Sequence, residues 1–416
     1  MVSVDFRTRS AAVGTVDLVT FRDHHLPDLL DRHGRAAGAA ARRLSLPPLT
    51  LRVGGEQLTF VPGDELTVRP DASAELLATL DPVTFSDLVQ DVVSLFGAQM
   101  TGRAELVHGT VAAFVEWEPV LRCLIDGRPV HRPGDIGFRD RTGGPLDPRR
   151  SFTLDDDPAE YGHFLAEAGY LHLRGVFTEA EMAAVSAELD TAIAAAARDD
   201  GASWWARTEP GGWYPARILG FNHQSATLRE LLTGPRFRSL AGCTDDTWVQ
   251  RDPLLDDAAE GLLKKVGVVE GASDVSWHKD CTMGGHSHHC AGLVVGISVT
   301  GAGPETGELG VVPGSHRANI ATLGIEGLDL TALPLPTRPG DLTVHLSCTL
   351  HMSRPPVGGE RRVVYTGFGL APRPGHETPA LDRTESRRRR AELSDRVIGH
   401  QRTGGPDRAR LASHEL

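Results

Sequence analysis

The chain has 416 residues, of which 40% are hydrophobic and 24% are charged, so it has the composition of a folded globular protein with room for more than one core. Its formal net charge of −12 argues against a nucleic-acid partner, because no long basic stretch precedes the arginine-rich C-terminal tail. The N-terminus lacks an apolar run, and no later segment approaches the roughly 20 apolar residues that a membrane helix needs. We therefore expect a cytoplasmic protein with a small-molecule substrate and no membrane partner.

The distribution of cysteines and lysines gives further information about the redox state and the possible sites of this protein. The five cysteines form no CxxC pair, which argues against a disulfide framework and a cysteine-based zinc site and favours reduced thiols. Among 43 basic residues only three are lysines, and all of them lie in one short stretch of the chain: Lys264, Lys265 and Lys279. Either the composition of the genome or a local role for lysine explains this distribution.

Residues 1 to about 148 are expected to form a small α+β domain. An Ala/Arg-rich helix is predicted from Leu26 to Arg43, followed by the β-like runs LTLRV and ELTVRP and by the apolar-periodic stretch TFSDLVQDVVSLFGAQM. The Gly/Pro-rich run from Gly134 to Arg150 is interpreted as a linker. The stretch from Asp64 to Val130 faintly resembles the sterol-carrier-protein-like fold, which encloses apolar ligands. An accessory or dimerisation domain, which would make the protein a homodimer, is the alternative.

A second domain is expected from about residue 149 to 375. AEYGHFLAEAGYLHLRGVF predicts a helix and then a strand, and Thr178 with Glu181 forms a capping box before a long helix. From about residue 262 onward, short apolar strands alternate with Gly/Pro turns, a spacing that favours an antiparallel double sheet. The polar, arginine-rich tail from 376 to 416 is expected to be partly disordered, with its four consecutive arginines on a solvated helix face.

The triplet His278-Lys279-Asp280 offers the start of a metal site. Two imidazoles and one carboxylate suit redox-active iron(II), because they leave three coordination positions open. Residues i and i+2 of an extended segment point the same way, so His278 and Asp280 could bind one ion together. With 18 histidines in the chain, roughly one such triplet is expected by chance, so the motif depends on its context.

Four segments in order supply that context: FLAEAGYLHLRGVFTEAEM, VSWHKD, ELGVVPGSHR and PGDLTVHLSCTLHMSRPPVGGERRVVYTGF. Together they resemble the phytanoyl-CoA dioxygenase family over about residues 155 to 373. The resemblance implies an α+β protein whose core is a double-stranded β-helix, a cupin-like jelly roll with flanking helices. It also implies Fe(II), 2-oxoglutarate as cosubstrate, and O2.

The family's site residues are carried over by position. His278, Asp280 and His351 match the metal ligands and so the catalytic centre; His345 is the rival for the last position, but only His351 has the family spacing to Ser353 and Arg362. Arg362, rather than its neighbour Arg361, is expected to face the barrel interior and bind 2-oxoglutarate, because arginine pairs bidentately with a carboxylate. Ser353 would add a hydroxyl contact. Lys265, on the strand entering the iron loop, would lie near the cosubstrate.

The sequence gives less information about the residues that contact the substrate than about the metal ligands. Lys279 is expected to project to the side opposite its neighbours, toward the cosubstrate or into solvent. His286, in the run GGHSHHC with His288 and His289, suits a mobile loop that contacts substrate or is simply exposed, more than a second metal site. Trp205 in GASWWARTEPGGWYPAR either lines a substrate pocket or anchors a loop.

The expected reaction is hydroxylation of an unactivated C–H bond in a small-molecule or acyl-type metabolite, coupled to decarboxylation of 2-oxoglutarate. Halide-transferring members of the fold have a small residue where this chain has Asp280, which favours hydroxyl as the transferred group. A desaturase or cyclase would need the same ligands. A metal- or ligand-binding protein without turnover and a zinc hydrolase are the alternatives from other classes, and the intact HKD motif with His351 and Arg362 argues against lost turnover.

Overall fold

The computed structural model describes residues 14–370 except 71–72, 199, 210, 244–247, 272–276, 284–291 and 322–327, and it also describes Arg388. The predicted tail lies almost entirely outside the described residues. Contacts divide the chain into two compact units. One contains the described parts of 14–137 together with two later segments, 277–283 and 315–329, and the other contains the remainder. The first break in the chain falls at Gly137, inside the stretch interpreted as a linker.

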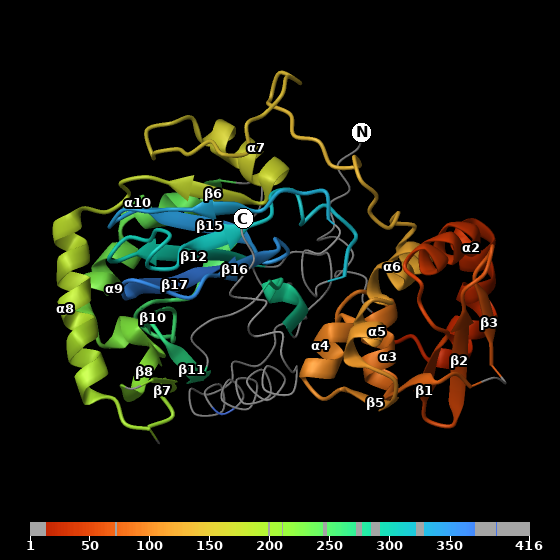
Figure 1. Cartoon of the computed structure of the whole chain (residues 1–416). Coiled ribbons are helices and arrows are strands. Elements are labelled where there is room, and N and C mark those ends of the chain that lie inside the picture. Colours follow the sequence, from red (N-terminus) through yellow and green to blue (C-terminus); the bar gives the residue numbers. More distant parts are fainter. Residues whose placement is uncertain are drawn as a thin grey trace. The chain divides into compact units, whose positions relative to one another are not determined.

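The first unit is built on one five-stranded sheet with strand order β3-β2-β1-β4-β5 (Figure 1). Strands β1 and β4 run parallel, and the other neighbours run antiparallel. The predicted helix is present as α2 with the expected bounds, and it follows directly on a short helix and a π-helical turn. The elements are α1 (Leu18–Thr20), η2 (Phe21–His25), α2 (Leu26–Arg43), β1 (Leu49–Val53), β2 (Glu56–Val61), β3 (Thr67–Arg69), β4 (Leu76–Leu80), α3 (Pro82–Val89), α4 (Leu95–Met100), β5 (Ala104–His108), α5 (Val111–Val115), α6 (Glu118–Asp126) and η5 (Asp280–Met283).

The apolar-periodic stretch between residues 84 and 100 is two helices rather than one. Asp91 adopts φ +58°, a left-handed conformation that ends α3 before α4 begins. This residue is buried, and its carboxylate lies 3.6 Å from the guanidinium of Arg122 in α6. Arg122 is fully buried as well, and it also pairs with Glu118 and Asp126 and donates to the carbonyl of Leu88. Satisfying this buried charge therefore ties α3 and α6 together.

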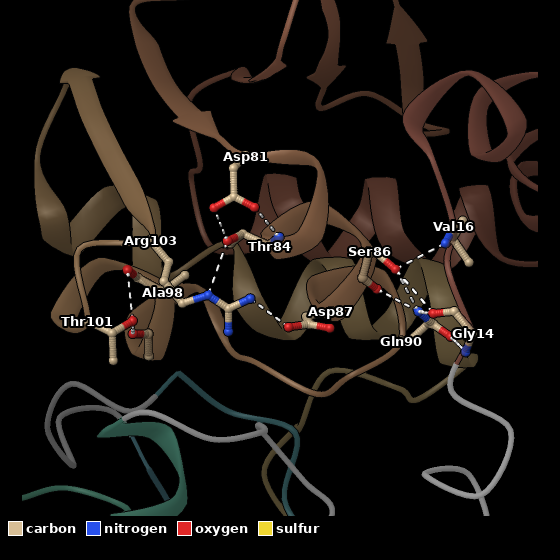
Figure 2. Close-up of polar contacts among 11 residues, drawn as sticks. Gly14, Val16, Asp81, Thr84, Ser86, Asp87, Gln90, Ala98, Thr101 and Arg103 are labelled. Carbon is tan, nitrogen blue, oxygen red and sulfur yellow. Dashed lines mark hydrogen bonds and ion pairs between the residues drawn. The ribbon is translucent and has the colours of Figure 1, made fainter. Parts of the chain in front are cut away.

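Helix α3 also holds the beginning of the described chain (Figure 2). The side-chain amide of Gln90, just after α3, donates to the carbonyl of Gly14 and accepts from its N–H, both at 2.8 Å, while Val16 N–H donates to Ser86 Oγ. On the other side of the helix, Arg103 donates to Thr84 and pairs with Asp87 at 2.6 Å.

The second unit contains a nine-stranded sheet and a three-stranded sheet. The large sheet has the order β11-β7-β8-β10-β17-β12-β15-β6 (Figure 1). Strand β9 pairs with β17, and the small sheet has the order β14-β13-β16. All the strand pairs of this unit are antiparallel among the described residues, and the two sheets form the expected jelly roll. Its helices are α7 (Pro158–Ala168), α8 (Glu179–Ala195), η3 (Phe221–His223), α9 (Ala226–Thr233), α10 (Pro235–Arg238) and η4 (Ser239–Gly242). Its strands are β6 (Tyr170–Leu173), β7 (Ser203–Thr208), β8 (Gly212–Ile218), β9 (Trp248–Gln250), β10 (Glu260–Lys264), β11 (Val268–Gly271), β12 (Gly292–Ser298), β13 (Leu309–Val311), β14 (Leu333–Leu335), β15 (Leu342–Leu346), β16 (His351–Ser353) and β17 (Arg361–Leu370).

Both faces of the large sheet are covered, and they differ in chemistry. One face carries apolar residues such as Val295, Val344 and Val364, which share a hydrophobic core with Leu189 of α8 and other helix residues. The opposite face, toward the small sheet, lines a small cavity bounded by residues from both sheets: Gly296, Ser298, Ala302, Leu309, Leu335, Thr337, Thr343, Arg361, Val363 and Tyr365. Alternation along each strand thus separates core residues from cavity residues.

Two expectations about topology and redox state can be compared with the described residues. None of the described helices is both long and apolar enough to cross a bilayer, and a cytoplasmic location stays a prediction.

The four cysteines within the described ranges are free thiols. Burial raises the pKa of the Cys243 thiol to about 12, so this thiol is unreactive at neutral pH.

The capping box that begins α8 is present, with Thr178 accepting from the Glu181 N–H and Glu181 accepting from the Thr178 N–H. We predict that Thr178→Ala lowers the free energy of unfolding by about 1 kcal/mol, because one N-terminal N–H of the helix loses its acceptor. Thr191→Ala in the same helix is the matched control, since this exposed threonine only donates back to Ala187 and alanine is the better helix former. Urea unfolding measures both; an equal loss at Thr191 would contradict the capping explanation.

Candidate metal centre

Three side chains form a potential metal site. His278, Asp280 and His351 each offer one ligand atom, and these atoms lie within 4.8 Å of one another. It is the one such group of histidine, cysteine and acidic residues found in the described part of the chain. His278 Nε2 lies 3.2 Å from Asp280 Oδ1, and His351 is the first residue of β16. Two imidazoles and one carboxylate on one side of an ion are the ligand set that leaves positions open for other molecules.

His351 is held in the tautomer that a metal ligand needs. Its Nδ1 lies 2.9 Å from the carbonyl oxygen of Thr349, which can only accept a hydrogen bond, so Nδ1 carries the proton and Nε2 keeps its lone pair. The ring is buried and packs against the ring of His345, with 4.1 Å between centroids. His345 therefore lies beside the proposed ligand, on β15 of the large sheet, and is not a member of the three-residue group.

A pair of buried cations lies two residues further along β16. Lys264 Nζ and Arg361 Nη2 both donate to Ser353 Oγ, at 2.6 and 2.7 Å. The pairing of β10 with β17 sets Lys264 directly opposite Arg361, and both side chains are almost fully buried. Arg361 makes no ion pair with a carboxylate among the described residues, and its buried Nε has no hydrogen-bond partner there. A buried guanidinium in this condition fits a bound anion.

The structure corrects two predictions at this point. Arg362 faces the helix-covered side of the sheet, where it donates to Ser186 and pairs with Asp190 of α8 at 2.8 Å, and this pairing raises its pKa above the ordinary value. Arg361, not Arg362, lines the cavity. Lys265 also points the other way, with Nζ 5.1 Å from the centroid of the Tyr214 ring, so Lys264 takes its place beside Ser353. The apolar residues that share a face with Arg362 face the helices instead of the cavity.

The remaining substrate predictions have different outcomes. Lys279 is fully buried and its Nζ donates to the carbonyl of Ser315 at 3.1 Å, which corrects the prediction of solvent contact, whereas its contact with the cosubstrate or substrate stays a prediction. Trp205 in β7 is partly buried and donates to Ser203, and its contact with substrate stays a prediction. His286 and its neighbours His288 and His289 lie outside the described residues.

The sequence reasoning did not select Arg361, Lys264 or Asn319, whose side chain donates to the carbonyls of Pro119 and Arg128 within the first unit. The available signal for Lys264 was the clustering of the three lysines. For Arg361 no signal existed, because two adjacent arginines are distinguished only by the register of the strand.

Comparison with known families identifies the class of the second unit. Residues 165–364 match the family model of phytanoyl-CoA dioxygenase (PhyH), and all three residues of the metal group lie within that range. This part of the chain is therefore similar to the phytanoyl-CoA dioxygenase family. A search of curated proteins found no match.

Solved structures with a similar fold were also found. AviO1 from Streptomyces viridochromogenes Tue57 is 23% identical, with 53% of this chain and 97% of that chain covered and a TM-score of 0.42. EctD from S. alaskensis, solved with 2-oxoglutarate and 5-hydroxyectoine, is 20% identical over 58% of this chain and 86% of its own, with a TM-score of 0.42. HygX from Streptomyces hygroscopicus, solved with nickel, 2-oxoglutarate and hygromycin B, is 18% identical over 50% and 86%, with a TM-score of 0.38.

We predict that His278→Ala and His351→Ala each abolish binding of a divalent metal, because two ligands cannot hold the ion against water. His345→Ala is expected to retain binding with weaker affinity, since it removes a ring packed on His351 but no ligand. Calorimetric titration with Mn²⁺ distinguishes the three variants. Loss of binding in His345→Ala together with normal binding in His351→Ala would reverse the ligand assignment.

Proposed function

We propose that this protein is an iron(II)- and 2-oxoglutarate-dependent dioxygenase that hydroxylates an unactivated C–H bond of a small-molecule or acyl-type metabolite. The observation that carries the proposal is the group of His278, Asp280 and His351 inside a domain similar to the phytanoyl-CoA dioxygenase family. His278 and Asp280 are partly exposed while His351 is buried, as expected of a site that a small molecule can reach. Bound iron(II) would supply the oxidation of the substrate C–H bond by O2.

The residues of this chain would divide the work of binding. His278, Asp280 and His351 hold the metal, and the hydrogen bond to the Thr349 carbonyl keeps the His351 ring in orientation. Arg361 and Lys264 hold the distal carboxylate of 2-oxoglutarate, with Ser353 as the shared hydroxyl contact. Because Ser353 and His351 are two residues apart on β16, their side chains point to the same side of the strand, so cosubstrate and metal would be held from one strand.

The second candidate is a desaturase or cyclase with the same metal and cosubstrate, since these reactions need the same ligands and differ in how the substrate is held. A zinc hydrolase is disfavoured by the cation pair of Lys264 and Arg361, because it needs no site for a carboxylate cosubstrate, and a binding protein without turnover is excluded only by a measurement of turnover. The test is to mix the protein with iron(II), 2-oxoglutarate and O2 and to measure succinate. Absence of succinate with every candidate metabolite, despite metal binding, would refute the oxygenase proposal.

We predict that Arg361→Ala weakens 2-oxoglutarate binding by roughly 10- to 100-fold, because a charge-assisted pair in a sheltered site contributes about 1.5–3 kcal/mol. Arg362→Ala is the matched control: it removes the same side chain from the neighbouring position, where the guanidinium pairs with Asp190, and it should leave the affinity within about twofold. Titration of both variants with 2-oxoglutarate in the presence of Mn²⁺ decides between them. A larger loss at Arg362 would mean that the cavity is not the cosubstrate site.

We predict that a substrate, once found, gains one oxygen atom from O2 even in excess chloride, because Asp280 occupies the coordination position that a halide would need. The product is weighed after reaction under ¹⁸O2. A chlorinated product would contradict the role of Asp280, and a product lighter by two hydrogens with no added oxygen would favour the desaturase or cyclase.

A further inference from the structure

The N-terminal residues 14–137 have no part in the chemistry proposed above, yet they form one compact unit with the segment that carries two of the three metal-binding side chains. Residues 277–283 and the described residues of 315–329 pack with residues 14–137 as one compact unit. His278 and Asp280 lie in the first of these segments. The contacts that join them to the N-terminal residues all lie inside this unit, and they follow two routes.

The first route runs through helices. The short helix η5 begins at Asp280 and lies against α4. The first residue of α4, Leu95, donates its N–H to Glu118 Oε2 of α6 at 2.6 Å, and Glu118 is buried. Glu118 also pairs with the buried Arg122 of α6. The contact of η5 with α4 therefore connects Asp280 to the buried ion pairs around Arg122 in the N-terminal domain.

The second route runs through Asn319. This side chain is 4% exposed, and its Nδ2 donates to two carbonyl oxygens of the α6 region, those of Pro119 at 2.9 Å and Arg128 at 3.1 Å. The backbone carbonyl of Asn319 accepts from the N–H of His131 at 3.1 Å. One asparagine thus satisfies backbone groups that would otherwise be buried without partners, which makes its position well determined.

Lys279 completes this second route. Its buried amino group donates to the carbonyl of Ser315, four residues before Asn319 in the chain, and Ser315 is buried as well. Burying an amino group is costly unless it is hydrogen-bonded, so this contact fixes the side on which Lys279 lies. Lys279 lies between His278 and Asp280 in the chain, so fixing its side chain restrains the backbone that carries both metal-binding residues.

We infer that the N-terminal domain serves as the support of the metal-binding segment, with Asn319 and Lys279 as positioning residues for His278 and Asp280. The inference rests on the proposed function only in taking these two residues as metal ligands. A segment held in place has less conformational freedom to lose when it binds an ion, so releasing it lowers metal affinity. The N-terminal domain would then be required for metal binding itself, and not only for stability or assembly.

The test measures Co²⁺ binding by the full-length protein without cosubstrate, because the visible absorption of Co²⁺ reports both affinity and ligand geometry. We expect Asn319→Ala and Asn319→Asp to weaken Co²⁺ binding by roughly tenfold, as for other residues that act through a ligand, and to change the absorption spectrum. Asn319→Asp keeps the size of the side chain but removes both N–H donors, which separates the hydrogen bonds from packing.

Asn222→Ala is the matched control. Asn222 is fully buried in the second unit and also donates to two backbone carbonyls, those of Pro253 at 2.9 Å and Asp256 at 2.8 Å. It should lower the melting temperature as Asn319→Ala does but leave Co²⁺ affinity within about twofold. An equal loss of affinity in both variants would overturn the inference, because affinity would then follow general stability.

Lys279 supplies an independent variant in case Asn319→Ala does not fold. Lys279→Met keeps the length of the side chain without its donor and should weaken Co²⁺ binding, whereas Lys279→Arg keeps a donor and should restore part of the affinity. Unchanged Co²⁺ affinity and spectrum in Lys279→Met and in folded Asn319 variants would overturn the positioning role. If the wild-type protein itself fails to bind Co²⁺, the assignment of the metal site is wrong and the proposed function is lost with it.

Discussion

The two-residue period of a β-strand is the constraint on which the site in the second unit depends. In β17, one set of alternate residues packs on helices and the other lines the cavity between the two sheets. The pairing of β10 with β17 then sets Lys264 opposite Arg361, and both side chains donate to Ser353 of the small sheet. Arg361 is buried on this face without an ion pair among the described residues, a condition that fits a bound anion.

In the first unit, the hydrogen bonds and ion pairs of buried polar groups determine which segments lie next to each other. Arg122 lies among three carboxylates, and Asn319 and Lys279 each donate to backbone carbonyls. Each of these groups would destabilise the fold if it were left without a partner, and each partner lies in a segment distant in sequence. Such contacts are specific in direction, so they determine which segments are neighbours more strictly than apolar packing does.

The family match and the geometry contribute different parts of the functional proposal. The match to phytanoyl-CoA dioxygenase covers residues 165–364 and identifies the class of oxygenase, but it does not say which of two adjacent arginines faces the cavity. The geometry answers that question and adds Lys264, whose partner on the opposite strand is Arg361. The identity of the substrate depends on residues around the open metal positions, among which the run that follows the HKD motif lies outside the described residues.

Local features were determined by the sequence alone. The helix from Leu26 to Arg43 and the capping box of Thr178 depend on interactions within a few residues, which a pattern of apolar and capping residues reports directly. The group of His278, Asp280 and His351 was selected from motif order, and the fold brings these side chains together. Their role as ligands stays a prediction.

Only the tertiary structure decided the features that depend on distant partners. The choice between Arg361 and Arg362, and between Lys264 and Lys265, depends on which covered face of the sheet each residue occupies, and both faces are buried, so alternation does not distinguish them. The break at Asp91 depends on a buried partner in α6, and the packing of residues 277–283 and 315–329 with the N-terminal domain depends on hydrogen bonds that span up to about half of the chain. Sequence patterns report the period of an element and its ends, whereas partners across such separations are set by the fold as a whole.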